Sequence, residues 1–522
     1  MIILRAVTAA TYTSSLVRFA EAEKHPWATT CDYGAGAELV LPDARVFMTV
    51  VAAAPPVLRW RAWRAWREIE MSAAKAEKPL EVVEICAGAG GQTLGLERAG
   101  FRHRLAIELD DKAAETLRRN LVEFLGYSED QARNSVRVGD VADPAVWNPV
   151  IDAEDLDLLA GGVPCPPFSI AGKQLGSSDE RDLFAWAIEL CGKVRPKALL
   201  LENVRGLSAN RFAGYRQHVL DRLKEYGYIA DWKLLQADHF GVSQLRPRFV
   251  LVALQEEYAP YFHWPEPNPE KAMSVGELLE DLMAENGWTG AKEWAQRATG
   301  IAPTIVGGSK KHGGADLGPT RAKRAWAEKG VDAMGVADEA PTAAGPPIIE
   351  GFPRPKLTTA MVARIQGWQD ADSEVSDRED DFRWRFHGRK TSVYRQIGNA
   401  FPPPVAMALG KSIYNALKME GEPHDLVETA DVVTDPVYKL LRSSTRALSV
   451  DQIITKLSAA GTAMDHPTVE RHLNHLKHDF EMTTVTRSNG ADAYTIGEFK
   501  AFVGQDDHQR HDLFSQHRSK IS

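Results

Sequence analysis

The residues with the clearest chemical potential are a cysteine and a carboxylate that each follow an apolar, strand-like run. Cys165 lies between prolines in GGVPCPPFS (161–169), and Glu202 ends the run ALLLE (198–202). Prolines stiffen the backbone, and a thiolate held in a cleft can act as a nucleophile. If the two runs are neighbouring parallel strands, the Glu202 carboxyl lies beside the thiol. The pair therefore predicts nucleophilic catalysis assisted by an acid, whereas a cysteine alone would more often be a buried structural residue.

A second group of candidates precedes the apolar run FVLVAL (249–254). Gln244, Arg246 and Arg248 alternate along the chain there. In an extended backbone alternate residues share one face, so three hydrogen-bond donors would point together. Because arginines in a strand that is buried on both sides are costly unless paired, this pattern favours a functional role over a structural one.

Three successive strand-like runs end in residues that suit an adenosine. The first leads into the glycine-rich segment CAGAGGQT (86–93), which opens a helix. Glycines let the backbone approach a ligand, and a helix N-terminus offers free N–H groups. Glu108 ends the second run, where it can hold ribose hydroxyls, and Asp140 follows the third, where it can accept from an adenine amino group.

These candidates require a sheet that brings the ends of separate strands together. Amphipathic helical stretches separate most of the short apolar runs, which predicts an α/β fold with a doubly wound, parallel, Rossmann-like sheet. In that architecture ligands bind at the carboxyl ends of the strands. The runs are 81–85, 104–108, 135–138, 156–160 and 198–202.

The length and composition of the chain limit its domain number, its possible cofactors and its location. The chain of 522 residues allows two to four domains, and its 44% hydrophobic and 25% charged residues exclude wholesale disorder. No apolar run is long enough for a membrane span, and the four scattered cysteines form no CxxC pair, so we expect neither a disulfide framework nor a metal site. A reducing cytoplasm is the predicted location. The net charge of −9 means that any nucleic acid must be bound by a local basic surface.

We expect six segments along the chain. Residues 79–256 and 356–420 form the predicted catalytic domain, and 257–355 a loop-rich insertion. Residues 1–78 are an extension of unknown role, in which Trp60, Trp63 and Trp66 recur among arginines. A helix packing on the next domain is favoured there over a nucleic-acid contact, and Met71 is an alternative translation start.

The last segments are a small domain and a tail. Residues 436–500 read as three helices and a hairpin with Asn489-Gly490 as its turn, an order that resembles a winged helix. The third helix would present Arg471, His472 and His475. Eight Lys and Arg against seven acids in this segment leave DNA binding and protein binding both open. Residues 503–522 are a predicted mobile tail.

Taken together, the motifs resemble those of the DNA cytosine-5 methyltransferases of bacterial restriction-modification systems. The resemblance covers 80–255 and 356–412 and keeps the family's order. Its pieces are CAGAGG, AIELDDKAAETLRRN, GDV, GGVPCPPFSIAGKQLGSSDERDLF, LENVRGL, QLRPRF and YRQIGNAFPPPVA.

The resemblance implies a reaction and a role for each catalytic candidate. Cys165 would add to carbon 6 of a cytosine flipped out of the duplex, and Glu202 would protonate ring N3. Carbon 5 would then take the methyl group of S-adenosylmethionine, which leaves as S-adenosylhomocysteine. Arg248 would hold the cytosine carbonyl oxygen, Arg246 would steady the catalytic loop or a phosphate, and Ser169 would contact the DNA backbone.

The resemblance also implies a cofactor site. Gly88, Gly90 and Gly91 would lie against the methionine part, Glu108 at the ribose, Leu109 on the adenine, Asp140 at its amino group and Asn399 near the carboxyl end. Cys86 and Pro166 depart from the family, which commonly has Phe and Gln at these positions, and Cys86 would pack beside the cofactor.

Residues 257–355 would be the target-recognition region, which reads one short site in double-stranded DNA. Its candidate DNA contacts are Lys310, Lys311, Arg321, Lys323 and Arg324. A cognate restriction endonuclease is an implied partner, and a monomer without membrane contact is expected.

Three other functions were weighed against this one. An RNA cytosine methyltransferase of similar architecture fits the motifs, but the insertion and the last small domain favour duplex DNA. A non-catalytic DNA-binding regulator would not need Cys165, Glu202 and Arg248. A methyltransferase acting on exocyclic amines would usually carry Asn/Asp-Pro-Pro-aromatic where this chain has Pro-Cys-Pro-Pro.

Overall fold

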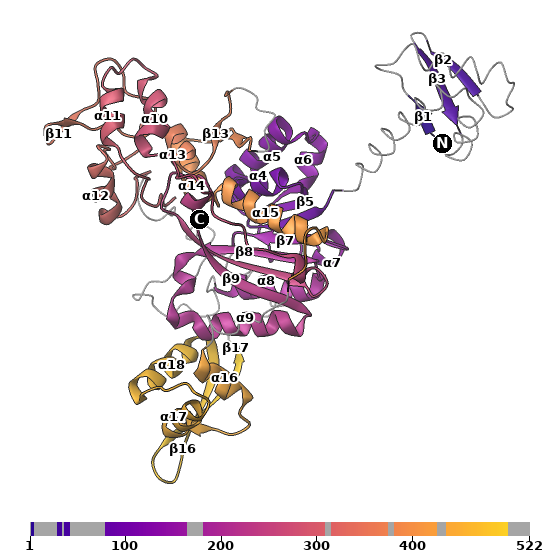
Figure 1. Cartoon of the computed structure of the whole chain (residues 1–522), viewed down its shortest axis with the longest axis vertical. Coiled ribbons are helices and arrows are strands. Elements are labelled where there is room, and N and C mark those ends of the chain that lie inside the picture. The colour runs from indigo at the N-terminus through magenta and orange to yellow at the C-terminus, as the bar shows by residue number, and fades with distance from the viewer. Residues whose placement is uncertain are drawn as a thin grey trace. The chain divides into compact units, whose positions relative to one another are not determined.

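The computed structural model describes residues 2–4, 29–33, 36–41, 79–163, 181–307, 315–373, 380–424 and 435–499. The chain divides into two compact units, Met1–Pro79 and Leu80–Ser522 (Figure 1). The described part of the first unit is an antiparallel sheet of β1 (Ile2–Leu4), β3 (Gly36–Leu41) and β2 (Thr29–Tyr33), in that order. The predicted tryptophan helix falls outside the described residues.

A seven-stranded sheet of order β6-β5-β4-β7-β8-β10-β9 organises the second unit. The first five strands in that order are parallel, which confirms the predicted doubly wound sheet, and each lies within two residues of its predicted run. β10 runs antiparallel to both neighbours, because a short connection returns the chain from β9 beside itself. The strands are β4 (Glu81–Ile85), β5 (Arg102–Glu108), β6 (Val136–Val138), β7 (Leu158–Gly161), β8 (Ala198–Val204), β9 (Tyr228–Gln236) and β10 (Pro247–Gln255).

Helices cover both faces of this sheet, and each face has its own core (Figure 1). On one face Val83 and Ile85 of β4 pack with Phe184 and Leu223, which come from α8 and α9. The alternation of β4 sends Val82, the residue before Val83, to the other face, where α4 and α15 pack. The helices are α4 (Gly91–Arg98), α5 (Asp111–Leu125), α6 (Glu129–Ser135), α7 (Pro149–Asp152), α8 (Arg181–Val194), α9 (Ala213–Glu225) and α15 (Pro403–Leu417), with 3-10 turns η1 (Arg205–Ser208), η2 (Asn210–Phe212), η3 (Ala237–Phe240) and η4 (Ala259–Tyr261).

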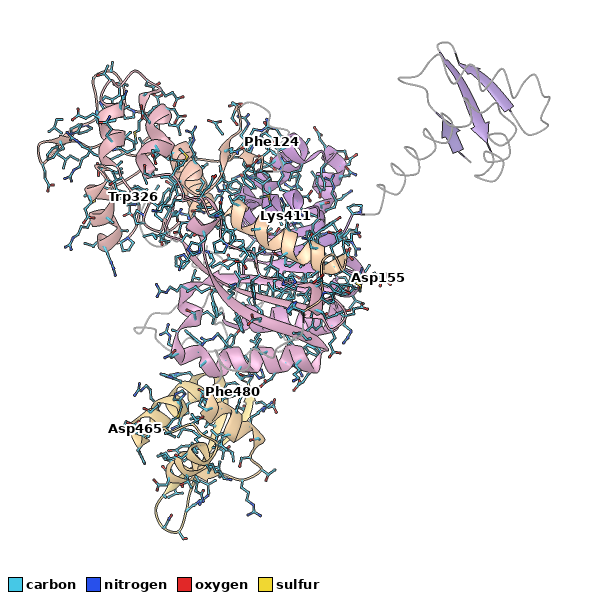
Figure 2. The ribbon with its side chains drawn as sticks, viewed as in Figure 1. Phe124, Asp155, Trp326, Lys411, Asp465 and Phe480 are labelled. Atoms are coloured by element: carbon cyan, nitrogen blue, oxygen red, sulfur yellow. The ribbon has the colours of Figure 1, made fainter. Side chains whose placement is uncertain are left out.

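The segment predicted to be loop-rich is more ordered than expected. Three helices form among its described residues, and the rings of Trp288, Trp294 and Trp326 are buried in a core that continues into α13 and α14. Figure 2 labels Trp326. Ser274 and Glu277 form a capping box that starts α10. The elements are α10 (Val275–Ala284), α11 (Ala291–Arg297), α12 (Thr320–Glu328), β11 (Ile348–Ile349), β12 (Phe352–Pro353), α13 (Thr359–Ile365), β13 (Gln369–Asp370), β14 (Arg383–Trp384) and α14 (Lys390–Asn399).

Residues 435–499 form a small bundle with its own core of Val437, Ile453, Leu473 and Phe480. Its three helices and its hairpin agree with the predicted elements, whereas its assignment as a winged helix stays a prediction. The elements are α16 (Pro436–Ser443), β15 (Leu448–Ser449), α17 (Val450–Ala459), α18 (His466–Asp479), β16 (Phe480–Thr486) and β17 (Asp492–Phe499). Among the described helices, none combines the length and the hydrophobicity of a membrane span.

Candidate active site

The glycine-rich loop between β4 and α4 turns through backbone conformations that glycine adopts most easily. Cys86, Gly88 and Gly90 have φ angles of 54°, 57° and 97°. A Cβ at Gly91 would lie 2.3 Å from the Phe401 carbonyl oxygen, whereas one at Gly88 would meet no atom within 4 Å. The loop is therefore packed tightly on one side and open on the other, as a backbone that approaches a ligand must be.

Glu108 at the end of β5 holds this loop in place. Its carboxylate accepts hydrogen bonds from the Gly88 N–H at 2.7 Å and from the Asp110 N–H at 2.8 Å. Burial raises the pKa of Glu108 although these hydrogen bonds oppose it. The next residue, Leu109, is 47% exposed, which offers an apolar surface at the strand end.

Asp140 and Cys86 complete this edge of the sheet. Asp140 follows β6 and accepts from the Ala142 N–H at 2.9 Å. Burial, and then the nearby carboxylates of Glu108 and Asp140, raise the pKa of the Cys86 thiol well above its usual value. The structure thus brings together the ends of the three strands that the sequence predicted to share a ligand. Because its pKa is raised, Cys86 stays protonated at neutral pH.

Trp384 is a residue at this edge that sequence reasoning missed. Its indole Nε1–H donates to the Ala89 carbonyl at 2.9 Å. Its ring packs so closely on Gly90 that a Cβ at this glycine would lie only 2.6 Å from a ring carbon. It comes from β14, and Arg98 of α4 ties the same segment down by donating to the Asp381 carbonyl at 2.7 Å. No local pattern relates positions so far apart in the chain, so only the aromatic cluster WRF (384–386) could have drawn attention to it.

The second centre lies on the neighbouring strands β7, β8 and β10. Glu202 is 8% exposed, and its Oε2 lies 3.2 Å from Arg248 Nε, an ion pair rather than an aligned hydrogen bond. Burial raises the pKa of Glu202 although Arg248 and Arg246 oppose it. A Cβ at Gly162 would lie 3.1 Å from Glu202 Oε1, so the carboxyl adjoins the segment that leads to Cys165. Cys165 and Ser169 themselves lie outside the described residues.

Arg246 has a different environment from the one expected of a group that meets a phosphate. It is 1% exposed, and its guanidinium donates to the Ile305 carbonyl at 2.6 Å, the Gly398 carbonyl at 2.7 Å and the Ala400 carbonyl at 2.9 Å. Burial lowers its pKa well below the usual value. These contacts make Arg246 a link between the start of β10, the end of α14 and the middle of segment 257–355.

The remaining cofactor candidate, Asn399, lies at the exposed end of α14. Its Oδ1 would be 2.4 Å from a Cβ at Gly307, so its side chain lies close to this glycine. The following residues reach the cofactor loop instead, through Phe401 against Gly91. The glycine-rich loop is therefore close to this segment, through the Phe401 backbone and the Ala400 side chain at Gly91.

The basic residues of the target-recognition region are not equivalent. On α12, Arg321 and Arg324 are exposed, whereas Lys323 Nζ forms an ion pair with Asp316 Oδ2 at 2.9 Å. Lys323 is thus already paired with a carboxylate, whereas the role of all three cations as DNA contacts stays a prediction. Lys310 and Lys311 lie outside the described residues.

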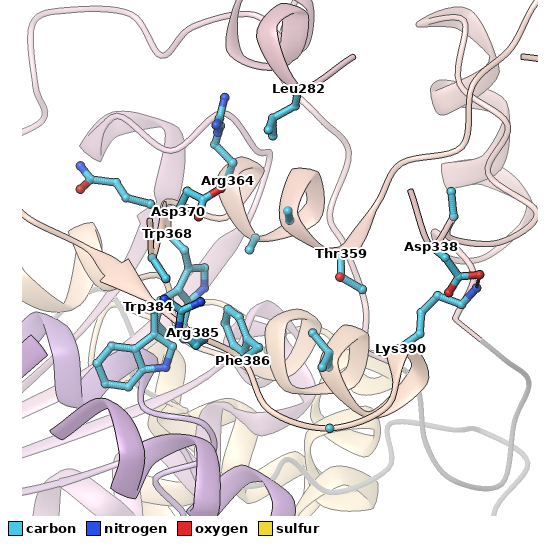
Figure 3. A pocket seen from close by; sticks show the side chains of 17 residues that line it. Leu282, Asp338, Thr359, Arg364, Trp368, Asp370, Trp384, Arg385, Phe386 and Lys390 are labelled. Atoms are coloured by element: carbon cyan, nitrogen blue, oxygen red, sulfur yellow. Dashed lines mark hydrogen bonds and ion pairs between the residues drawn. The ribbon is translucent and has the colours of Figure 1, made fainter. Parts of the chain in front are cut away.

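A pocket of about 380 Å³ lies between α13, α14 and the segment around β14 (Figure 3). Trp368, Trp384 and Phe386 form part of its wall, and Lys390 and Asp338 pair across it at 2.9 Å. None of the predicted site residues lines it. Trp384 lines this pocket and also contacts the glycine-rich loop through its hydrogen bond to Ala89.

Comparison with known proteins decides what these two centres belong to. The family described as C-5 cytosine-specific DNA methylase matches residues 80–415, which include both. The chain belongs to this family. It is an S-adenosylmethionine-dependent DNA cytosine methyltransferase, and its resemblance to the family is confirmed.

Two curated relatives are Type II methyltransferases. The chain is 60% identical to M.NaeI of Lentzea aerocolonigenes over 443 residues, which cover 85% of this chain and 99% of the relative. It is 48% identical to M.NgoMIV of Neisseria gonorrhoeae over 344 residues, 65% of this chain and 98% of the relative. Among solved structures, the Dnmt2 methyltransferase of S. pombe matches with 16% identity and a TM-score of 0.41, over 65% of this chain and 99% of that chain.

Proposed function

We propose that this methyltransferase methylates carbon 5 of a cytosine that is flipped out of a short, specific duplex site, through a covalent bond between Cys165 and carbon 6. The observation that carries the proposal is the buried pair of Glu202 and Arg248 beside Gly162. In a family of cytosine methylases, an acid and a donor held at the edge of the cysteine segment suit the ring edge of the target base.

Glu202 and Arg248 would act on the same edge of the cytosine. Since burial raises the pKa of Glu202, the carboxyl can keep a proton and share it with ring N3. Arg248 would donate to the carbonyl oxygen next to it. Both contacts draw electrons from the ring, which makes carbon 6 open to attack.

The Cys165 thiolate would supply the electrons for the remaining steps. Its attack forms the sulfur–carbon 6 bond, N3 takes the Glu202 proton, and carbon 5 becomes an enamine carbon that takes the methyl group. Removal of the carbon 5 proton by a base then returns its electron pair to the ring. The sulfur leaves, N3 gives its proton back, and aromaticity is restored.

S-adenosylmethionine supplies an electrophilic methyl group when bound and leaves as S-adenosylhomocysteine. The described residues suit this cofactor, because there is open space in front of Gly88. The carboxylate of Glu108, the exposed side chain of Leu109 and the carboxylate of Asp140 lie at the same edge of the sheet. Glu108 would hold the ribose, Leu109 the adenine face and Asp140 the amino group. Cys86, Gly90, Gly91 and Asn399 would form the rest of the site.

Double-stranded DNA would lie against the target-recognition region, with Arg321 and Arg324 as phosphate or base contacts and Lys310, Lys311 and Ser169 as further candidates. Arg246 would act as a positioning residue, since its donors are engaged by backbone carbonyls. We also propose a cognate restriction endonuclease as a functional partner, because the curated relatives are Type II methyltransferases.

Bisulfite sequencing of plasmid DNA from a host without cytosine methylation tests the proposal. Expression of this chain should protect one cytosine in one recurrent short sequence, and the Cys165→Ala variant should protect none while it still binds S-adenosylmethionine. Methylation that persists in the variant would refute the nucleophile. Soluble protein that leaves all DNA unmethylated would refute duplex DNA as the substrate and direct the search to RNA.

A further inference from the structure

The C-terminal bundle, residues 435–499, is packed closely against helix α9 of the catalytic domain. The His218 ring stacks on Phe499 with 4.7 Å between centroids and packs T-shaped on Phe480 with 5.4 Å between centroids. Figure 2 labels Phe480. Tyr438 Oη lies 3.4 Å from His218 Nδ1. A Cβ at Gly214 would be 2.4 Å from Leu476. This contact holds α18, which carries Leu476, in a defined position on the catalytic domain.

Helix α18 therefore lies beside the segment that leaves the catalytic strand. It contacts α9 and also η2, and η2 follows β8 and η1 directly in the chain. Glu202 is only eight residues before Asn210, the first residue of η2. The exposed Arg205 lies on η1, between the catalytic strand and this contact.

The two faces of α18 have different chemistry. Val469, Leu473 and Leu476 are buried in the bundle. Arg471, Asn474 and His478 are exposed, and their spacing of three and four residues places them on one face. No described carboxylate forms an ion pair with Arg471. The neighbouring carboxylate of Glu470 instead places its Oε1 3.5 Å from His466 Nδ1. Arginine pairs with phosphates and with guanine edges, and asparagine pairs with adenine edges.

We propose that this face of α18 binds the duplex that flanks the methylation site, so that the enzyme contacts DNA on both sides of its target. The inference rests on the proposed function, because it requires duplex DNA as the substrate. Charge complementarity favours DNA as the occupant, since the exposed Arg471 and Arg205 lie on the two elements next to η2. The near-neutral charge of the bundle predicts few phosphate contacts, one or two rather than many.

The experiment compares two duplexes that contain the methylated sequence found by bisulfite sequencing. One extends only a few base pairs beyond the site, and the other extends about 15 base pairs, more than one helical turn, on each side. The dissociation constant of the full chain is measured for both across a salt series. The variants are Arg471→Ala and, as a matched control, Lys439→Ala, which removes one exposed positive charge from α16 of the same bundle.

The Arg471→Ala variant should bind the long duplex about five-fold more weakly, with the slope of log Kd against log salt reduced by about one. Its affinity for the short duplex and its kcat on the short duplex should equal those of the wild type, and Lys439→Ala should match the wild type throughout. Equal affinities of wild type and Arg471→Ala for the long duplex would overturn the proposal, as would an equal loss in both variants. Failure of the proposed function is distinct, because then the wild type would methylate neither duplex.

Discussion

The predicted cofactor edge of the sheet and the predicted target-recognition region are held together in different ways. At the cofactor edge, β4, β5 and β6 are hydrogen-bonded neighbours, so the residues after each strand, including Glu108 and Asp140, meet because the topology requires it. In the target-recognition region, the helices are held by buried tryptophans such as Trp326, and the exposed cations take whatever positions this core leaves them. Chemistry at strand ends is therefore readable from sequence, whereas chemistry on such an insertion depends on packing between distant residues.

The largest effect should come from the catalytic half of the comparison. Glu202→Gln removes the proton that the buried carboxyl would give to N3, and we expect kcat to fall by about 10²- to 10⁴-fold. Because the pKa of Glu202 is raised, the wild-type rate should fall as pH rises through that pKa, and the variant should lose this dependence. Single-turnover methyl transfer against pH measures both. An unchanged affinity for S-adenosylmethionine is the control, and a variant with near-wild-type turnover would contradict the role of Glu202.

The next largest effect should come from the Arg246 link between the two regions. Arg246→Met would leave the Ile305 and Gly398 carbonyls without the donor that Arg246 supplies, whereas the Ala400 carbonyl keeps the Gln366 side chain as a donor at 3.0 Å. Each buried group that loses its partner costs about 1–3 kcal/mol. We therefore expect the free energy of unfolding to fall by at least about 2 kcal/mol in urea titrations. If stability were unchanged while DNA binding weakened, Arg246 would be a phosphate contact instead.

Within the cofactor edge, Glu108→Ala should weaken S-adenosylmethionine binding by about 10- to 100-fold, since a charged acceptor that holds the loop contributes about 1.5–3 kcal/mol. Trp384→Phe keeps the ring but loses the donor to Ala89, so a loss of about two- to ten-fold is expected. Calorimetric titration with S-adenosylmethionine ranks the two. Equal effects, or none in Glu108→Ala, would show that the loop does not depend on the β5 strand end.

A buried histidine between β4 and α4 should make stability depend on pH. The ring nitrogens of His103 lie 2.9 Å from Glu84 Oε2 and 2.9 Å from Glu97 Oε1. Burial alone would lower the pKa of His103, but hydrogen bonds to these carboxylates raise it from 6.5 to about 9. A folded-state pKa above the unfolded one adds stability that is complete below about pH 6.5 and is lost as pH rises through about 9. In urea titrations between these pH values, wild type should lose more stability than His103→Gln.

The smallest effect should separate the cations of α12. Arg321→Ala should weaken duplex binding by about five-fold and reduce the salt slope by about one, whereas Lys323→Ala should change affinity by less than about two-fold because Asp316 already neutralises it. Filter binding in a salt series distinguishes them. A larger effect in Lys323→Ala would mean that its ion pair opens when DNA binds.

The sequence predicts the parallel core of the fold and one edge of the site because both follow from local patterns. The apolar runs mark the strands to within two residues, and Glu108 and Asp140 are placed by strand order alone. Local patterns could not predict the antiparallel direction of β10 or the contact of Trp384 with Ala89. Each depends on where a segment that comes later in the chain packs against an earlier one. The same limit explains Lys323, whose partner Asp316 is fixed by the packing around α12.

The target-recognition region also contained a signal that the loop-rich prediction did not use. Ser274 followed three residues later by Glu277, before the apolar residues Leu278 and Leu279, is a capping-box pattern that marks the start of α10. The prolines of 265–269 and the glycines of 300–318 favour loops on either side of this helix, which is why the whole segment is predicted to be loop-rich. Local patterns of this kind identify single helices, but they do not identify the tryptophan core that joins them.

The covalent step is tested most directly with a duplex whose target cytosine carries fluorine at carbon 5. Cys165 can add to this base and the methyl group can be transferred, but fluorine cannot leave as a proton does, so the enzyme should remain bonded to DNA. The account predicts a complex that survives denaturing electrophoresis with wild type and S-adenosylmethionine, and that is absent with Cys165→Ala. Turnover of the fluorinated duplex without any such complex, or a complex that persists in Cys165→Ala, would contradict it.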